Sequence, residues 1–339
     1  MRIGMLTGGG DAPGLNAAIR AVVRAAHEAG HRTSGIRNGW AGALEGRIDE
    51  LLPRDVRGIL PLGGTVLGTS RTNPLKEADG LQRAMGQLTS HGIDAVVAMG
   101  GDDTLSIATA LHETGYPVVG VPKTIDNDLS ATDFCIGFDT AVGIVAEALD
   151  RLHTTASAHH RVMVVEVMGR DVGWVATMGG LAGGADIVLI PEYHVGLDEV
   201  VEHLRRRRGE GEDSSVVVVA EGVRMAGVET GSGVTDAFGH VRLSERGVGD
   251  ALSRAIEAAT GFETRVTVLG HLQRGGTPST VDRIWATRLG ARAAELAIDH
   301  CSGVIPVRRD GDVAVVPLAD VLEQRRVPKE LYELTRLFG

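Results

Sequence analysis

The sequence has few cysteines, few aromatic side chains and no long apolar run, and each shortage excludes a class of protein. Its two cysteines, Cys135 and Cys301, form no CxxC pair and are too few for a disulfide framework or a zinc site. Aromatic residues make up 3% of the chain, whereas glycine occurs 47 times, which favours glycine-rich strand-to-helix turns over an aromatic-cored β-sandwich. No apolar run approaches the roughly 20 residues that a membrane-spanning helix needs.

The chain also has fewer basic than acidic residues. The 34 lysines and arginines face 44 acidic residues, for a net charge of −10, which argues against a nucleic-acid or anionic-membrane partner. An anionic small-molecule substrate would therefore need a locally positive pocket. The chain starts with the strand-like residues MRIGMLT rather than with the basic flank and apolar core of a signal peptide. We therefore expect a soluble, cytoplasmic protein.

The length of 339 residues exceeds what one hydrophobic core usually supports, so two domains are expected. Short apolar runs alternate with helical patterns in both halves, which predicts two α/β units. The clearest expected strands are residues 3–7, 95–99, 118–121, 162–167 and 216–220. The Gly/Thr/Ser-rich stretch 222–239 indicates a surface insertion.

Three expected strands of the first half end in acidic turns, which read GGGDAPG, GGDDT and PKTIDND. Ligands of open α/β sheets bind beyond the carboxyl ends of the strands, so we expect the three turns to share one site. A strand, glycine turn and helix in succession also point backbone N–H groups at a phosphate. The first turn matches neither the GxxxxGKS/T nor the GxGxxG pattern, so the usual mononucleotide and dinucleotide folds are not indicated.

The residue types in these turns suit phosphoryl transfer. One carboxylate of the pair Asp126 and Asp128 could accept a proton from an attacking hydroxyl, while the other holds a metal or orients the acceptor. One acid of the pair Asp102 and Asp103 could hold Mg²⁺ through water between phosphate oxygens. The alternative at both places is a polar turn whose side chains only cap a helix. Arg71, at the end of GGTVLGTSR, suits a phosphate oxygen.

The second half carries basic residues beside its expected strands. Arg161 precedes the strand VMVVEV, which leads into the residues MGR. Arg265 begins another strand, and His271 and Arg274 follow it in GHLQRGG. Each of these side chains could meet a phosphate or a sugar hydroxyl, although a single histidine is more often structural.

Together these motifs make the chain resemble the phosphofructokinase family along almost its whole length. In the family's order they are GGGDAPGLNAAIR, GGTVLGTSR, GGDDT, PKTIDND, HRVMVVEVMGR, AEG and ETRVTVLGHLQRGG. The resemblance implies an α/β fold of two Rossmann-like three-layer α/β/α domains, with the active site in the cleft between them. Residues 1–137 with 273–323 would bind the phosphoryl donor, and residues 138–272 with 324–339 would bind fructose 6-phosphate.

The resemblance also implies a role for each matching residue. Asp126 would be the base that accepts the proton of the 1-hydroxyl of fructose 6-phosphate, and Arg170 would neutralise charge on the moving phosphoryl group. Thr124 and Asp128 would position the sugar and the phosphoryl group, with Thr124 also counted as catalytic. The other sugar-phosphate positions are Met168, Gly169, Glu221, His271 and Arg274; the donor positions are Gly10, Arg71, Thr104 and Lys123; the Mg²⁺ position is Asp102.

Arg161 and Arg265 resemble the family's arginines that reach from a neighbouring subunit to the sugar 6-phosphate. The resemblance therefore implies a homo-oligomer, either a homodimer or a homotetramer.

Two positions indicate the phosphoryl donor, because ATP-using bacterial relatives have glycine where this chain has Asp103 and Lys123. A carboxylate at residue 103 would oppose the nucleotide's α-phosphate, and like charges about 4 Å apart cost roughly 1–4 kcal/mol at effective dielectrics of 80 to 20. Lys123 could instead bind a phosphate of a smaller donor. We expect a reversible, Mg²⁺-dependent phosphorylation of fructose 6-phosphate by pyrophosphate. The alternatives are ATP as the donor, or a sugar-phosphate-binding regulatory subunit without catalysis.

Overall fold

The computed structural model describes residues 1–228, 230–231 and 247–337. The chain divides into two compact units: unit 1 contains Met1–Thr140 and Arg274–Gln324, and unit 2 contains Ala141–Gln273 and Arg325–Gly339. The domain boundaries expected after residues 137, 272 and 323 lie within three residues of these. Part of the stretch 222–239, expected to be a surface insertion, lies outside the described residues. Within the described chain, no helix has both the length and the apolar character to cross a membrane.

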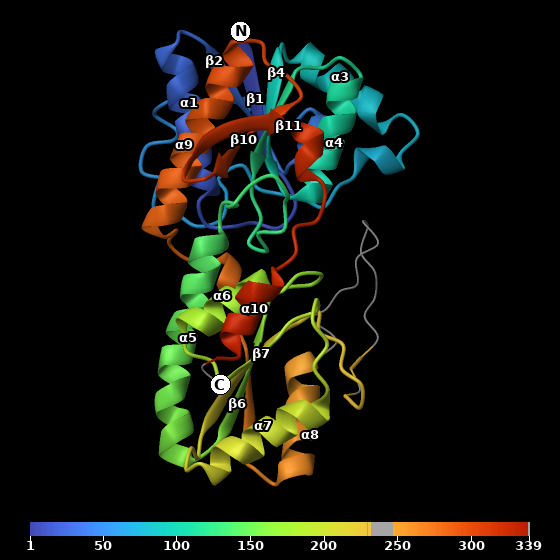
Figure 1. Ribbon diagram of the computed structural model, residues 1–339. Coiled ribbons are helices and arrows are strands. Elements are labelled where there is room, and N and C mark those ends of the chain that lie inside the picture. The colour runs from blue at the N-terminus through green and yellow to red at the C-terminus, as the bar shows by residue number, and fades with distance from the viewer. Residues whose placement is uncertain (229, 232–246, 338–339) are drawn as a thin grey trace. The chain divides into compact units, whose positions relative to one another are not determined.

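Unit 1 is built on a seven-stranded sheet in the order β11-β10-β5-β4-β1-β2-β3 (Figure 1). Its strands are β1 (Arg2–Thr7), β2 (Arg32–Ile36), β3 (Ile48–Glu50), β4 (Ala95–Gly100), β5 (Val118–Pro122), β10 (Val304–Arg309) and β11 (Asp312–Pro317). The two edge strands run antiparallel to their neighbours and the other pairs are parallel. Thr7 pairs with Met99, and Met99 with Val121, so the carboxyl ends of β1, β4 and β5 lie level. The three acidic turns therefore do follow neighbouring parallel strands.

Helices cover this sheet. The helices are α1 (Leu15–Glu28), α2 (Trp40–Glu45), α3 (Gly80–Ser90), α4 (Asp102–Glu113) and α9 (Thr280–Ile298), with the short 3₁₀ helices η1 (Pro74–Lys76) and η4 (Leu318–Val321). Figure 1 shows α1 and α9 to one side of the strands and α3 and α4 to the other. A Cβ on Gly290 of α9 would lie 2.6 Å from the Ala18 carbonyl oxygen of α1, so glycine permits this close helix contact. The buried stripes of α1 and α9 form one core with Ile3, Met5, Val97 and Val119.

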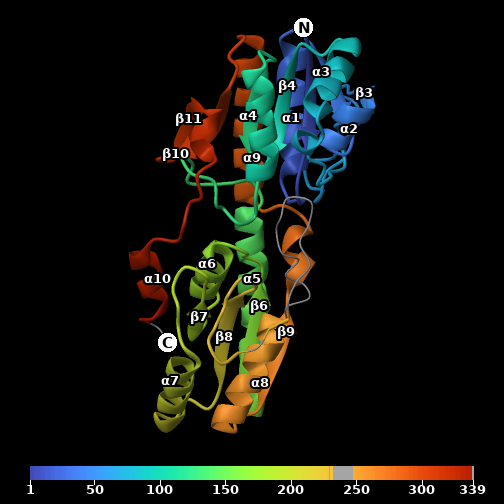
Figure 2. The ribbon, with the colours of Figure 1, turned by 90° about the vertical axis from the view of Figure 1, so that its right-hand side faces the viewer.

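Unit 2 contains a four-stranded parallel sheet in the order β7-β8-β6-β9, visible in Figure 2. Its strands are β6 (Val162–Val167), β7 (Ile187–Leu189), β8 (Ser215–Ala220) and β9 (Thr264–Val268); its helices are α5 (Phe138–His159, begun in unit 1), α6 (Trp174–Ala182), α7 (Leu197–Gly209), α8 (Val248–Thr260), α10 (Lys329–Thr335) and η3 (Gly270–Arg274). Every residue of β6 and β8 is buried, as expected of parallel strands covered on both faces. The prediction of two α/β domains is confirmed.

Candidate active site

Thr104 joins the first two acidic turns of unit 1. The backbone N–H of Gly8 donates to the Met99 carbonyl at 3.0 Å, which holds the turn after β1 beside the end of β4. A Cβ on Gly8 would lie 2.4 Å from Thr104 Oγ1, and one on Gly100 would lie 2.3 Å from Thr104 Cβ. Both positions therefore require glycine, and Thr104, expected on the donor side, is buried between them.

Two cations converge on the turn after β1. Lys123 Nζ donates to the Gly10 carbonyl oxygen at 2.5 Å, and Arg274 Nη1 donates to the Asp11 carbonyl oxygen at 3.2 Å. A Cβ on Gly10 would lie 2.5 Å from Arg274 Nη1, so a side chain there would displace the guanidinium. The structure thus brings Gly10, Lys123 and Arg274 together, and their charges suit a phosphate group.

The loop that carries Arg71 also contacts this turn. The Gly9 N–H donates to the Ser70 carbonyl at 3.2 Å, and the Thr69 hydroxyl donates to the Gly9 carbonyl at 2.6 Å. Arg71 itself is exposed and directly follows these anchors in the chain. The donor-side role of Arg71 stays a prediction.

The third turn carries the two candidate catalytic carboxylates, and Asn127 fixes the backbone between them. Asn127 has φ +51°, in the left-handed region that asparagine tolerates better than most residues. Its buried side-chain Oδ1 accepts the Cys135 N–H at 2.9 Å. Thr124 Oγ1 accepts the Asp126 N–H at 3.1 Å, and the Thr124 side chain also hydrogen-bonds to Asp128. Thr124, Asp126 and Asp128 are therefore held as one polar cluster.

Negative charge accumulates at this cluster. Burial raises the pKa of Asp128 above its usual range, and the nearby carboxylates of Asp126 and Asp102 raise it further. Asp102 and Asp103 both lie in the first turn of α4, where the helix dipole favours acidic side chains. Because α4 begins at Asp102, both acids belong to the helix.

Asp102, Asp126 and Asp128 lie near enough to one another for their charges to interact, and their oxygens are of the type that binds Mg²⁺. Carboxylate oxygens are the ligands that this ion prefers, and a divalent cation would relieve the repulsion that raises the pKa of Asp128. No three His, Cys, Asp or Glu side chains in the described part of the chain are arranged to hold a metal ion alone. A bound Mg²⁺ would therefore also need phosphate oxygens and water, as is usual for this ion in phosphoryl-transfer sites.

In unit 2, the segments that follow β6 and β8 are joined at the carboxyl edge of the sheet. The Gly222 N–H donates to the Gly169 carbonyl at 3.0 Å, and a Cβ on Gly222 would lie 1.8 Å from the Arg170 carbonyl oxygen. Gly169 has φ +142°, outside the range that other residues readily adopt. Met168, Gly169 and Arg170 are thus packed beside Glu221, and Arg170 Nε is buried without a hydrogen-bond partner among the described residues.

The turn after β9 lies against the same edge through Gln273, which sequence reasoning did not identify. This side chain is fully buried; its Oε1 accepts the Met168 N–H at 3.2 Å and its Nε2 donates to the Gly270 carbonyl at 3.0 Å. His271 is exposed on the short helix that Gln273 anchors. The signal was available in the motif GHLQRGG, where an amide side chain stands among residues able to bind a phosphate or a sugar.

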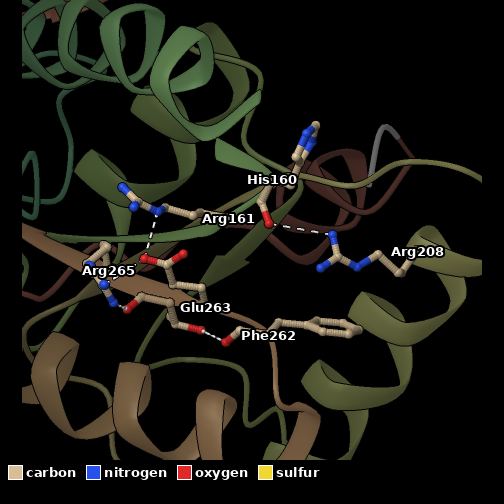
Figure 3. A network of polar contacts seen from close by, with 7 residues as sticks. His160, Arg161, Arg208, Phe262, Glu263 and Arg265 are labelled. Atoms are coloured by element: carbon tan, nitrogen blue, oxygen red, sulfur yellow. Dashed lines mark hydrogen bonds and ion pairs between the residues drawn. The ribbon is translucent and has the colours of Figure 1, made fainter. Parts of the chain in front are cut away.

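Arg161 and Arg265 lie at the amino ends of the strands of this sheet, opposite the carboxyl ends where Met168 and Glu221 lie. Arg161 immediately precedes β6, and Arg265 is the second residue of β9, next to the paired residues Val162 and Thr264. Six strand residues at about 3.3 Å each separate this edge from Met168 by roughly 20 Å. The structure therefore groups the two arginines with each other, around Glu263 (Figure 3), and not with the sugar-phosphate positions of the same chain.

The sequence matches known proteins over its whole length. A family model described as phosphofructokinase matches residues 2–297. A relative named pyrophosphate--fructose 6-phosphate 1-phosphotransferase, from Streptomyces coelicolor, is 52% identical over 100% of this chain and 99% of its own length. The ATP-dependent 6-phosphofructokinase of Chloroflexus aggregans is 48% identical over 94% of this chain and 90% of its own.

Solved structures agree with these matches. The pyrophosphate-dependent phosphofructokinase from Marinobacter aquaeolei superimposes with a TM-score of 0.83 at 25% identity, covering 97% of this chain and 86% of that chain. The phosphofructokinase from Saccharomyces cerevisiae gives a TM-score of 0.80 at 33% identity over 99% of this chain, which spans 46% of the yeast chain. On fold, motif order and sequence identity alike, the chain belongs to the phosphofructokinase family.

Proposed function

We propose that the protein transfers a phosphoryl group from pyrophosphate to the 1-hydroxyl of fructose 6-phosphate, reversibly and with Mg²⁺. The products are fructose 1,6-bisphosphate and phosphate. The relative at 52% identity carries the name of this activity. The observation that carries the proposal for this chain is the buried Lys123 at the Gly10 carbonyl, together with Asp103 in the first turn of α4.

Charge at these two positions favours the smaller donor. Lys123 brings a cation to the glycine turn, where it can bind a phosphate of pyrophosphate. Asp103 adds a carboxylate at the start of α4, where backbone N–H groups would otherwise attract a nucleotide phosphate. Like-charge repulsion about 4 Å from the α-phosphate would cost roughly 1–4 kcal/mol, enough to disfavour ATP by about tenfold or more.

Transfer of the phosphoryl group to the sugar needs a base for the 1-hydroxyl and alignment of the hydroxyl with the donor phosphorus. In our proposal Asp126 takes the proton of the 1-hydroxyl, the hydroxyl oxygen forms a bond to the terminal phosphorus, and phosphate leaves with the electrons of the broken P–O bond. Thr124 and Asp128 orient the reacting groups, and Arg170 neutralises charge on the phosphoryl oxygens. Mg²⁺, bound at Asp102 through water, would neutralise the donor phosphates. Unit 1 would bind the donor and unit 2 the sugar phosphate.

The geometry of unit 2 supports a homo-oligomer. A hexose 6-phosphate is far shorter than the roughly 20 Å between the two edges of the sheet, so it cannot contact Met168 and Arg161 of one chain. If Arg161 and Arg265 bind the 6-phosphate, a second copy must supply them. We propose a homodimer or homotetramer in the cytoplasm, a compartment in which Cys135 and Cys301 would stay reduced.

The test is a coupled assay of the purified protein with fructose 6-phosphate at equal Mg²⁺, supplied with either pyrophosphate or ATP. We expect kcat/KM to be at least tenfold higher with pyrophosphate and the reverse reaction to proceed with phosphate. A preference for ATP would establish the function named for the relative at 48% identity instead. Sugar-phosphate binding without turnover on either donor would indicate a regulatory subunit.

A further inference from the structure

Glu263 connects the two arginines at the amino edge of the unit 2 sheet. Its Oε1 lies 2.9 Å from Arg161 Nε and 2.6 Å from Arg265 Nη2, so one carboxylate oxygen contacts both guanidinium groups (Figure 3). The backbone reinforces this arrangement, because the Val162 N–H, next to Arg161, donates to the Glu263 carbonyl at 3.0 Å. Glu263 therefore holds the start of β6 through its main chain and Arg161 through its side chain.

Each arginine keeps guanidinium N–H groups that can bind an anion in addition to Glu263. Arg161 contacts Glu263 through Nε, and among the described residues no ion pair is made by its two terminal nitrogens, which can therefore face an anion. Arg265 also donates from Nη1 to the Thr264 carbonyl at 3.0 Å, which fixes the plane of its guanidinium. The side chains of Arg161 and Arg265 are 27% and 51% exposed, so both are accessible. Planar guanidinium forks held in this way match the oxygens of a phosphate.

We propose that Glu263 is a positioning residue, which holds Arg161 and Arg265 together as one preformed site for the 6-phosphate of the sugar bound by a neighbouring copy. The inference rests on the proposed function. Without a hydrogen-bond acceptor between them the two guanidinium groups would not be held together, and each side chain would sample many rotamers. Binding the phosphate would then require ordering both side chains, which costs affinity.

The neighbouring charged cluster is separate from this site. Arg208 stacks over the Phe262 ring at 4.4 Å and donates to the Asp213 carbonyl, while His160 pairs with the Asp213 carboxylate. None of these contacts involves Glu263, and Arg208 instead reaches the His160 carbonyl oxygen at 3.5 Å (Figure 3). The Glu263 side chain is 41% exposed, so solvent weakens its ion pairs and they add little to folding stability; its loss should change binding rather than unfolding.

Two variants of Glu263 distinguish its role in holding the arginines in place from the effect of its negative charge. Glu263→Ala removes the acceptor oxygen, and we expect the KM for fructose 6-phosphate to rise about tenfold, the cost of ordering two released side chains. Glu263→Gln keeps an acceptor oxygen and should hold that KM within about threefold of the wild type, because the geometry survives. In both variants kcat, the KM for pyrophosphate and the unfolding temperature should stay near wild-type values. Asp312→Ala, which removes a carboxylate 2.6 Å from Arg288 in unit 1, is the matched control and should change none of these.

A double-mutant cycle shows whether Glu263 acts through the arginines. In an Arg265→Ala background, whose own KM should already be raised, adding Glu263→Ala should have a much smaller effect than in the wild type. Fully additive effects would overturn the proposal, as would an unchanged KM in Glu263→Ala or an equal loss in the glutamine and alanine variants. If the wild type used neither donor, the proposed function would fail instead, and equilibrium binding of fructose 6-phosphate to the same variants would still test Glu263.

Discussion

Lys123 donates from Nζ to the Gly10 carbonyl oxygen at 2.5 Å and so links the end of β5 to the turn after β1. The lysine is 3% exposed, and burial, followed by the charge of Arg274, lowers its pKa from 10.5 to about 8. The carboxylates of the site oppose this shift and keep the side chain charged at neutral pH. The donor site thus contains a cation that titrates just above neutrality.

This titration should appear in the use of pyrophosphate. Below pH 8 Lys123 is protonated and can bind the donor; above it the charge is lost, so kcat/KM for pyrophosphate should fall as pH rises through about 8. Lys123→Met should lower kcat/KM for pyrophosphate about 10- to 100-fold, because the loss of one charged hydrogen bond changes affinity by about this factor. The same variant should no longer show the fall in kcat/KM near pH 8. The KM for fructose 6-phosphate is the internal control. A fall near pH 8 that persists in Lys123→Met would assign it to another group.

Asp103→Gly tests the exclusion of ATP. Removing the carboxylate from the first turn of α4 relieves repulsion against a nucleotide phosphate, and we expect kcat/KM with ATP to rise about tenfold or more. Pyrophosphate kinetics of the same variant show whether the site is intact. ATP turnover that stays at the wild-type level would mean that Asp103 does not set donor choice.

Asp126→Ser tests the base. We expect kcat to fall about 10²- to 10⁴-fold, the usual contribution of general base catalysis, while equilibrium binding of fructose 6-phosphate changes little. The isosteric variant Asp126→Asn should show the same loss, because it keeps the shape and removes the basic oxygen. Turnover near the wild-type rate in either variant would remove Asp126 from this role.

Much of this site was predictable because the residues that bind phosphate stand directly after buried strands. The apolar runs before GGGDAPG, GGDDT and PKTIDND identified β1, β4 and β5 and hence the edge where Lys123 and Asp126 lie. By contrast, β2 has the sequence RTSGI, with little apolar character of its own, and becomes a strand through pairing with β1. The contact of Glu263 with both arginines depends on the register of β6 against β9, which no local pattern reports.

A buried acid links pH to stability. Asp282 on α9 is fully buried and accepts the Gly137 N–H at 2.6 Å and the Thr140 N–H at 2.8 Å, which caps the start of α5. Burial raises its pKa from 3.8 to about 6, so the folded protein binds more protons than the unfolded chain between these values. The contribution of this group to the free energy of unfolding should therefore fall by about 3 kcal/mol as pH rises through that window. The difference in stability between the wild type and Asp282→Asn, measured by chemical unfolding from pH 4 to 7, should show this fall; a constant difference would contradict it.

Hybrid oligomers test whether two copies build one sugar-phosphate site. Asp126→Ser removes the proposed base, and the double variant Arg161→Ala with Arg265→Ala removes the proposed phosphate ligands, so each homo-oligomer should be nearly inactive at low fructose 6-phosphate. In a co-expressed hybrid, some sites would combine an intact base from one chain with intact arginines from the other. Because the arginines lie at the opposite ends of the strands from Met168, roughly 20 Å away, the proposed site would be completed by sharing between chains. We expect purified hybrids, separated by two affinity tags, to regain turnover that neither parent shows. Hybrids as inactive as their parents would mean that the arginines serve their own chain or bind no substrate.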